Sequence, residues 1–525
     1  VEEEIVPLAE ALFAAARAHG WQADPDALLS SAAGPAVAPP APTAAPDLLI
    51  EWQPRHLAAL GESAELLITP LDEEGQPSPN QPVTITRMEP PGISVEGVTG
   101  EAGSLRCSIA HDVPEAEFYR YAVRAGDVER VVEIPVVGVR FILEGNPISG
   151  GAYRGVAADG VSTLAVQVEV SGWQGQVRLE APEHGTLEDV DGQPLAPGRL
   201  ALDPHGRAEF AYRPPDYLDV VSSTVEGAVA WPADLDARGV LDELRLVLVE
   251  GGSEGQAVSV EMPVVRPPVV LVHGLDGEPA ALGLLEGYLS EVGYDVDVGD
   301  YVREPGDEAG ATPALAALLR QRVGAQVAGY AREGLKLGRV DIVAHSTGGL
   351  VARHYVQDAE RYRGDVRKLI MLGTPNHGVG LHDRPLSAVL SWWLGRVGAA
   401  REDLHPTSTL LRMLNAGEDE GRHLVPEIEY AVLAGRMPAE EFIDPHLPGD
   451  PAWAYVATDG VVTVSSARLN GAPLYLIDGA CHCAELNQLS PVPRPEPGIA
   501  AFRGAWERVG GLLGAPIPQP PLDDE

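Results

Sequence analysis

Hydrophobic and polar positions alternate along the chain from residue 47 to about 266. Short runs such as 64–68 and 119–123 have a period of two, and clusters of Gly, Pro and Asp separate them. A period of two places one face of a strand in a core and the other face in solvent. The pattern therefore predicts antiparallel β-sandwiches over this stretch.

The pattern of apolar residues changes at residue 267, where continuous apolar runs begin to alternate with runs of helical period. The predicted strands are 269–272, 294–298, 339–344 and 366–372. The predicted helices between them are 281–292, 313–332 and 348–358. Strands that alternate with helices indicate a parallel sheet covered on both faces.

The N-terminal segment has two different patterns of its own. Residues 1–33 place apolar side chains on one helical face, and residues 34–46 are rich in Pro and Ala. Proline lacks the amide hydrogen that a helix interior needs, so the second stretch is expected to be a stiff, extended linker.

Composition excludes several classes of function. The 525 residues include 77 acidic and 37 basic ones, which gives a formal net charge of −40. A field this negative argues against nucleic acid and anionic membranes as partners. No apolar run reaches the roughly 18 residues of a membrane-spanning helix. The three cysteines, Cys107, Cys481 and Cys483, are too few for a disulfide framework.

The segment D-I-V-A-H-S-T-G-G-L-V-A at 341–352 carries the first candidate chemistry. A predicted strand leads into Ser346, and a predicted helix follows at once. Small residues stand two positions to either side, Ala344 and Gly348, as the sharp turn of a nucleophile elbow requires. The helix N-terminus also favours a developing anion. We predict that Ser346 is a nucleophile; the alternative is an ordinary serine in a tight turn.

A second glycine-containing turn precedes this elbow. The apolar strand of V-V-L-V-H-G-L at 269–275 ends at His273 and Gly274. Enzymes with such an elbow place an oxyanion-binding loop after this strand. The backbone N–H groups of Leu275 and Thr347 are the predicted oxyanion donors, and His273 is expected to line the substrate site. The alternative is that these residues merely end a strand.

Chain order selects the partners of the serine, because in this arrangement the acid follows the serine and the histidine comes last. His482 is the last histidine in the chain and follows the predicted strand 473–477. Asp459 is the predicted acid, with Asp444 and Asp450 as alternatives in the same connection. The three residues would act as nucleophile, acid and base of a catalytic triad.

About 50 residues between Thr374 and Ile428 have no place in a minimal sheet, and an insertion this long is usually functional. Apolar residues recur there at helical spacing around Trp392 and Trp393. We predict a lid near 376–425 that covers Ser346 and contacts substrate through these tryptophans. The alternative is a helix that packs in the core.

Several motifs together resemble the bacterial triacylglycerol lipase and esterase family. They are A-H-S-T-G-G-L-V-A-R at 344–353, L-G-T-P-N-H-G at 372–378 and D-L-x-P-x-S-x-x-L-x-x-L-N at 403–415. The resemblance covers 267–515 and implies an α/β-hydrolase fold and ester hydrolysis without a cofactor. Some members of the family hold a structural calcium ion, but no clear acidic cage is present here, so no metal is predicted.

The phrases A-A-D-G-V-S-T-L-A-V-Q-V-E-V at 157–170 and D-P-H-G-R-A-E-F-A-Y-R-P-P at 203–215 resemble bacterial Ig-like repeats of the invasin and intimin type. The first predicted sandwich is a weaker match that depends on the strand pattern. The resemblance implies a surface or polymer ligand for these repeats. We expect a secreted or cell-surface protein, although the given chain shows no signal peptide.

The predicted fold class is multidomain: all-β Ig-like sandwiches followed by an α/β-hydrolase domain with a mostly parallel sheet. The expected bounds are 1–46 for helix and linker, 47–138 and 139–266 for the sandwiches, 267–515 for the hydrolase domain and 516–525 for a tail. The predicted function is hydrolysis of lipid or other hydrophobic esters, with activity retained by 267–525 alone. The alternatives are an acyltransferase or polyester depolymerase, or a surface adhesin with an inert hydrolase domain.

Overall fold

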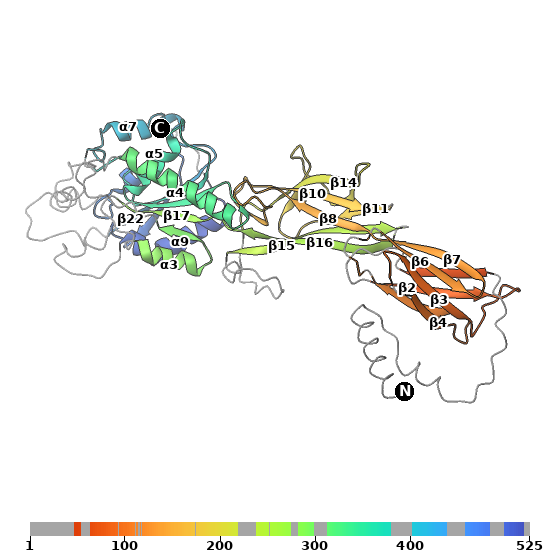
Figure 1. The fold of residues 1–525 in the computed structure, drawn as a ribbon. Helices are drawn as coiled ribbons and strands as arrows, with labels where there is room; N and C mark the ends of the chain where they lie inside the picture. Colours follow the sequence, from red (N-terminus) through yellow and green to blue (C-terminus); the bar gives the residue numbers. More distant parts are fainter. Residues whose placement is uncertain are drawn as a thin grey trace, which may run out of the picture.

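The computed structural model describes residues 47–53, 63–92, 94–110, 112–113, 116, 118–173, 175–218, 238–250, 253–274, 282–298, 312–379, 402–437, 457–482 and 498–518. The predicted N-terminal helix and linker lie outside these residues, and so does most of the predicted tail. The described chain forms three regions in a row, two made of β-strands and one of mixed helices and strands (Figure 1). The predicted fold class is confirmed.

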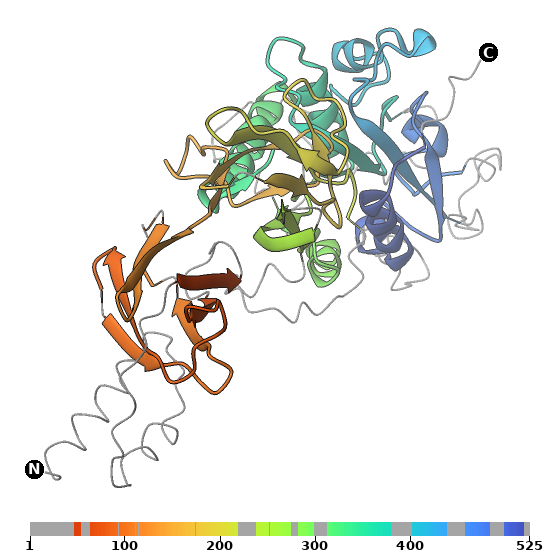
Figure 2. The same ribbon diagram turned by 90° about the vertical axis from the view of Figure 1, so that its right-hand side faces the viewer.

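The first β-sandwich consists of two antiparallel sheets. One has the order β1 (Asp47–Gln53), β2 (Ser63–Leu71), β5 (Leu105–Ala110). The other has the order β4 (Ser94–Val98), β3 (Pro82–Glu89), β6 (Phe118–Ala125), β7 (Val128–Pro135). Buried residues alternate along β6, where Tyr119, Tyr121 and Val123 face the core. This sandwich is set apart from the rest of the described chain in Figure 2.

The second β-sandwich also has two sheets. One has the order β12 (Thr186–Glu188), β14 (Arg207–Arg213), β10 (Leu164–Ser171), β8 (Gly138–Leu143). The other has the order β13 (Gly198–Leu200), β11 (Gln176–Leu179), β15 (Gly239–Glu250), β16 (Ser253–Val265), β9 (Gly155–Ala157), β19 (Leu335–Lys336). Strand β19 comes from beyond residue 267 and pairs with β9 in parallel. The second sandwich therefore shares a sheet with the region that follows it.

The third region contains a six-stranded parallel sheet. Its order is β18 (Val296–Val298), β17 (Val269–Val272), β20 (Val340–His345), β21 (Val366–Leu372), β22 (Glu429–Arg436), β23 (Leu474–Asp478). All five pairings are parallel. Every residue of β17 and β21 is buried, as expected when helices cover both faces of a sheet.

Helices cover the parallel sheet on both faces (Figure 1). Val270 and Val272 pack on one face with residues of α4 (Thr312–Arg332) and α5 (Gly348–Gln357). Val269 and Leu271 pack on the other face with residues of α3 (Gly283–Glu291) and α9 (Arg503–Gly514). Neighbouring residues of β17 therefore serve two separate cores, which explains why this strand is apolar throughout.

Of the segment in which a lid is predicted, near 376–425, only residues 376–379 and 402–425 lie among the described ones. Residues 402–425 contain α7 (Thr409–Leu414), whose Leu410, Leu411 and Leu414 are buried in the same core as α5. These leucines therefore pack inward, against the core of the third region. Trp392 and Trp393 lie outside the described residues, and a lid there stays a prediction.

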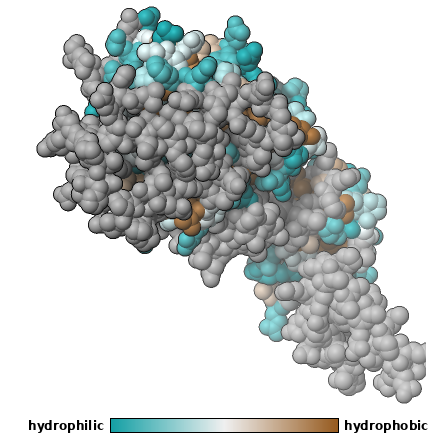
Figure 3. Space-filling model, turned by 90° about the vertical axis from the view of Figure 1, so that its left-hand side faces the viewer, coloured by the Kyte–Doolittle hydropathy of each residue, from teal (hydrophilic) through white to brown (hydrophobic). Residues whose placement is uncertain are grey.

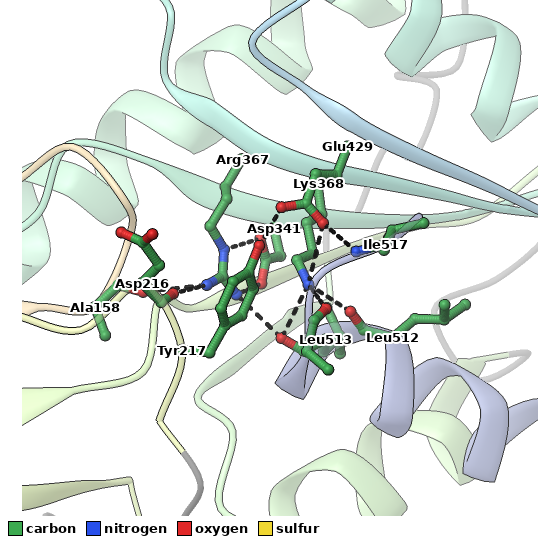
Figure 4. A network of polar contacts seen from close by, with 11 residues as sticks. Ala158, Asp216, Tyr217, Asp341, Arg367, Lys368, Glu429, Leu512, Leu513 and Ile517 are labelled. Atoms are coloured by element: carbon green, nitrogen blue, oxygen red, sulfur yellow. Dashed lines mark hydrogen bonds and ion pairs between the residues drawn. The ribbon is translucent and has the colours of Figure 1, made fainter. Parts of the chain in front are cut away.

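Buried charges join the second sandwich to the N-terminal end of the parallel sheet (Figure 4). Arg367 on β21 donates from Nε and Nη2 to the carboxylate of Asp341 on β20, at 2.9 and 2.6 Å. The same guanidinium donates through Nη1 to the backbone oxygens of Ala158 (3.1 Å) and Asp216 (2.9 Å) in the sandwich. The candidate site lies at the opposite end of the sheet, where strands β20, β22 and β23 end.

The described surface suits the acidic composition. On the face shown in Figure 3, hydrophilic residues predominate among those that are coloured, and the hydrophobic ones lie scattered. No helix among the described residues has the length and apolar character needed to cross a bilayer.

Candidate active site

The candidate nucleophile lies in a strained turn between β20 and α5. Ser346 has a φ of 54°, in the left-handed region that residues with a Cβ atom rarely adopt. Its N–H donates to the Leu372 carbonyl oxygen on β21 at 2.9 Å. A Cβ atom on Gly348 would lie 2.6 Å from the carbonyl oxygens of Val272 and His273. Gly348, two residues after the serine, therefore lets α5 begin directly against β17.

The structure brings Ser346, His482 and Asp459 together, although they are far apart in the chain. The Ser346 Oγ lies 2.9 Å from His482 Nε2, and His482 Nδ1 lies 2.8 Å from Asp459 Oδ2. The exposed fractions of the three residues are 3%, 2% and 1% in that order. A carboxylate at Nδ1 keeps the proton there, so Nε2 is left to accept the proton of the serine hydroxyl.

The loop after β22 fixes the candidate acid. Asp459 Oδ1 accepts the N–H groups of Val461 at 3.0 Å and Val462 at 2.7 Å, which leaves Oδ2 for the histidine. Gly460 makes this turn possible, because its φ of 98° suits glycine. The alternatives Asp444 and Asp450 lie outside the described residues.

Two glycines that the sequence reasoning did not single out make room for the acid and the base. A Cβ atom on Gly373 would lie 3.0 Å from Asp459 Oδ2 and 3.2 Å from His482 Nδ1. A Cβ atom on Gly435 would lie 2.8 Å from the Cβ atom of Asp459. Gly373 belongs to the motif at 372–378, and both glycines lie at the C-terminal ends of β21 and β22, where this fold puts its chemistry.

The predicted oxyanion loop lies beside the candidate nucleophile. A Cβ atom on Gly274 would lie 3.1 Å from the Cβ atom of Ser346, so a larger residue would press on the serine. His273 directly follows β17 and is buried, and Thr347 is the buried N-cap residue of α5. Leu275 lies outside the described residues, so the oxyanion hole stays a prediction.

The motif L-G-T-P-N-H-G at 372–378 connects the elbow helix to the loop that carries Asp459. Arg353 of α5 is fully buried and donates to Asn376 Oδ1 at 3.0 Å, Asn415 Oδ1 at 2.8 Å and the Leu414 carbonyl oxygen at 2.7 Å. Asn376 Nδ2 in turn donates to the Ala467 carbonyl oxygen at 2.8 Å. Burial lowers the pKa of Arg353 to about 10, so the guanidinium remains charged at neutral pH.

A hydrogen bond between two titratable side chains holds the next residue of this motif. His377 Nε2 lies 2.9 Å from Glu418 Oε2, and the His377 N–H donates to the Ser466 carbonyl oxygen at 3.0 Å. The hydrogen bond to Glu418 raises the pKa of His377. Burial by itself would raise the pKa of Glu418, but hydrogen bonds from His377 and from the Asn470 N–H lower it to about 2. Both groups are therefore favoured in their charged forms.

Comparison with known proteins adds one family match. The family model described as palmitoyl protein thioesterase matches residues 268–400, which include β17, the elbow and β21. No curated protein matches the sequence. Among the described residues, no group of His, Cys, Asp and Glu is arranged to hold a metal ion.

Several solved structures share parts of the fold. Phospholipase PlaB from Legionella pneumophila is 18% identical with a TM-score of 0.36, and the match covers 48% of this chain and 60% of that chain. Bacillus licheniformis lipase BlEst2 in its mature form is 23% identical with a TM-score of 0.30, covering 41% of this chain and 84% of that one. The Yersinia pseudotuberculosis adhesin InvE is 13% identical with a TM-score of 0.16, covering 41% and 58%.

These structural likenesses are too partial to carry a conclusion about activity. The strands, the helices and the family match are the stronger findings, and together they support a hydrolase. The bond that it cleaves and the residues that cleave it are matters for proposal.

Proposed function

We propose that the protein is a serine hydrolase that cleaves carboxylic esters of hydrophobic acyl groups. The observation that carries the proposal is the continuous hydrogen-bonded series from Ser346 Oγ through His482 to Asp459, in a buried site at the C-terminal end of a parallel sheet. This series has the nucleophile, base and orienting acid that acyl transfer needs.

In the first half of the proposed reaction, Ser346 Oγ attacks the ester carbonyl carbon while His482 Nε2 takes the hydroxyl proton. The Asp459 carboxylate stabilises the imidazolium that forms. The backbone N–H groups of Thr347 and Leu275 are the proposed donors to the oxyanion. His482 then gives its proton to the departing alcohol oxygen, and the C–O bond to that oxygen breaks.

In the second half, water replaces the alcohol. His482 removes a proton from water as the water oxygen attacks the acyl-serine carbonyl carbon. Collapse of this second tetrahedral intermediate breaks the bond to Ser346 Oγ, which recovers its proton from the histidine. The products are a carboxylic acid, an alcohol and free enzyme, and no cofactor takes part.

Turnover of p-nitrophenyl esters tests the proposal. Ser346→Ala and His482→Ala should each lower kcat by about 10⁴ or more, and the double variant should lose little beyond either single one, because the residues act as a unit. Asp459→Asn should cost about 10⁴ through the wrong histidine tautomer. Ser290→Ala, on the exposed side of α3, is the matched control and should behave as wild type.

Two results would contradict these assignments. Wild-type rates for Asp459→Asn with loss of activity for Asp444→Asn or Asp450→Asn would move the acid to another residue. A purified, folded wild-type protein that neither cleaves p-nitrophenyl esters nor reacts covalently with a fluorophosphonate at Ser346 would favour the inert adhesin.

A thioester is a second candidate substrate, which the family match over 268–400 favours. The same nucleophile would attack a thioester carbonyl carbon, and the leaving thiolate would need less help from a proton than an alkoxide does. A palmitoyl thioester and a palmitoyl oxygen ester with the same acyl chain separate the two candidates. A kcat/KM at least about tenfold higher for the thioester, equivalent to roughly 1.4 kcal/mol of transition-state binding, would reassign the substrate.

A further inference from the structure

His345 stands next to the candidate nucleophile in the chain, but its side chain contacts the candidate base. It is the last residue of β20. Its Nε2 atom lies 3.1 Å from the backbone carbonyl oxygen of His482. The ring centroids of the two histidines are 5.1 Å apart, with an angle of 38° between the planes. The elbow strand therefore reaches the base directly, by a route separate from the serine hydroxyl.

With this contact, the base is held at four points. The His482 N–H donates to the Asp459 carbonyl oxygen at 2.8 Å, so the backbone is held on its amide side by the acid loop. His345 holds the same backbone on its carbonyl side. The two ring nitrogens contact Asp459 and Ser346. Because Ser346 follows His345 directly, the contact ties the position of the base to that of the nucleophile.

The chemistry of the contact fixes the form of His345. A carbonyl oxygen only accepts, so Nε2 of His345 must carry the proton. Burial lowers the pKa of His345 to about 3, and the charge of His482 contributes in the same direction. Asp459 opposes this shift and His273 adds to it. His345 is therefore neutral at neutral pH and brings no second positive charge close to the imidazolium that forms during acyl transfer.

We propose that His345 is a positioning residue that sets the backbone of His482 relative to Ser346 by donating a hydrogen bond from neutral Nε2. The inference rests on the proposed function, because it gives His345 a role in that reaction. It assigns no proton transfer to His345 itself. An error of about 1 Å in the placement of a reacting group can cost about 10²-fold in rate, so a loss on this scale is the expected signature.

Two amide variants separate positioning from packing. His345→Gln places an amide N–H close to the position of Nε2, whereas His345→Asn carries the same group on a side chain shorter by one carbon. We expect His345→Asn to lower kcat on a short p-nitrophenyl ester by about 10- to 100-fold with little change in KM. We expect His345→Gln to restore kcat close to the wild-type value. Thermal unfolding of all three proteins shows whether each variant is folded.

A second readout does not depend on turnover. The proton between His482 Nδ1 and Asp459 should give a far-downfield proton resonance, which His482→Gln removes. We expect this resonance to shift or broaden in His345→Asn and to be retained in His345→Gln. The acid limb of the kcat profile should be the same in wild type and in His345→Gln, because a group with a pKa of about 3 does not titrate near neutral pH.

The outcomes distinguish this inference from the proposed function. If wild type cleaves esters and His345→Asn matches wild type in both kcat and the downfield resonance, the positioning role is wrong. If the acid limb of the kcat profile is absent in His345→Gln, His345 itself titrates during catalysis. The proposal that it acts as a neutral hydrogen-bond donor is then overturned. If wild type cleaves no ester but His345→Asn still moves the resonance, the positioning role stands and the proposed function fails.

Discussion

The first sandwich, β1 to β7, and the second sandwich, β8 to β16, come from the same alternating pattern, yet they meet the hydrolase domain differently. In the described chain, ion pairs of the first sandwich join its own strands, as between Arg120 and Glu133 or between Arg130 and Asp47. The second sandwich also has internal ion pairs, as between Arg140 and Glu169, but others cross into the hydrolase domain, as between Glu144 and Lys336 at 2.7 Å.

The apolar cores follow the same division. Ala331 of α4 is buried in the core of the second sandwich, and Ala157 and Val265 of that sandwich are buried in a core of the hydrolase domain. Asp159 Oδ2 accepts the N–H groups of Gly338 at 2.6 Å and Arg339 at 3.1 Å across the same junction. A shared sheet and shared cores indicate that the second sandwich and the hydrolase domain fold as one unit, whereas the first sandwich has its own core.

The largest expected effect comes from cutting the chain at the two junctions. Residues 138–525 should fold and retain activity on a short soluble ester. Residues 267–525 should not fold cooperatively, because β19 loses β9 and Arg367 loses two backbone acceptors. Several lost hydrogen bonds at about 1 kcal/mol each, with the lost apolar burial, are comparable to a total stability of about 5–15 kcal/mol.

Near-UV circular dichroism and turnover of p-nitrophenyl butyrate would check both truncations. From the sequence alone, residues 267–525 are expected to be active by themselves, whereas the shared sheet leads to the opposite expectation. A folded 267–525 with wild-type kcat would show that the second sandwich is an independent module like the first. Equal loss in both truncations would remove the distinction between the sandwiches.

The second effect concerns the charges at the junction. Asp341→Asn leaves the buried Arg367 without its carboxylate, and breaking a buried pair costs about 3–5 kcal/mol. Glu65→Gln in the first sandwich breaks an exposed pair with Arg106 and should change the free energy of unfolding by less than about 1 kcal/mol. Urea unfolding of both variants measures the contrast. Similar changes in the free energy of unfolding for the two variants would mean that the buried pair at the junction stabilises the protein no more than the exposed pair does.

The third effect is a pH dependence at the same junction. Burial lowers the pKa of Lys368 to about 8, well below its ordinary value of 10.5. Between these two values the unfolded chain binds more protons at this site than the native protein, so stability rises with pH through this window. Relative to Lys368→Met, wild type should gain about 1–2 kcal/mol between pH 7.5 and 9.5.

Urea unfolding of wild type and Lys368→Met at the two pH values gives this difference directly. Lys368 Nζ lies 4.5 Å from the centroid of the Tyr217 ring of the second sandwich, so the test reports on the junction itself. A constant difference between the two proteins would show that the ammonium is not destabilised there, and a difference that favours Lys368→Met at higher pH would reverse the sign.

The smallest expected effect is that of removing the Tyr217 hydroxyl, which forms a hydrogen bond with the hydrolase domain. The Tyr217 OH donates to Glu429 on β22, and Glu429 Oε2 also accepts the Ile517 N–H at 2.6 Å (Figure 4). Tyr217→Phe should cost about 1 kcal/mol, since the aromatic contact with Arg367 and Lys368 remains. A double-mutant cycle with Glu429→Gln should show coupling between the two side chains. Strictly additive effects would mean that this hydrogen bond does not stabilise the junction.

Local patterns in the sequence determined much of the hydrolase domain. The apolar run at 366–372 gave the bounds of β21, and the strand, small residues and helix around Ser346 gave the elbow, because each depends on neighbours within one turn or one strand. The order of residues along the chain pointed to His482 and to Asp459, with Asp444 and Asp450 as alternatives for the acid, and the structure brings His482 and Asp459 to the serine. Both sandwiches also followed from local alternation.

Tertiary structure alone decided what joins these elements. Arg367 and Lys368 interrupt an apolar strand, and no local pattern indicates that they contact the second sandwich at residues 158, 216 and 217. The leucines of 409–414 have a helical period, but only the structure shows that they pack in the same core as α5. The period of apolar residues along a segment shows which face of the helix or strand is apolar. The surface against which that face packs depends on contacts between residues distant in sequence. His345 is the clearest case, since its chain neighbour is the proposed nucleophile and its hydrogen-bond partner is the backbone of the proposed base.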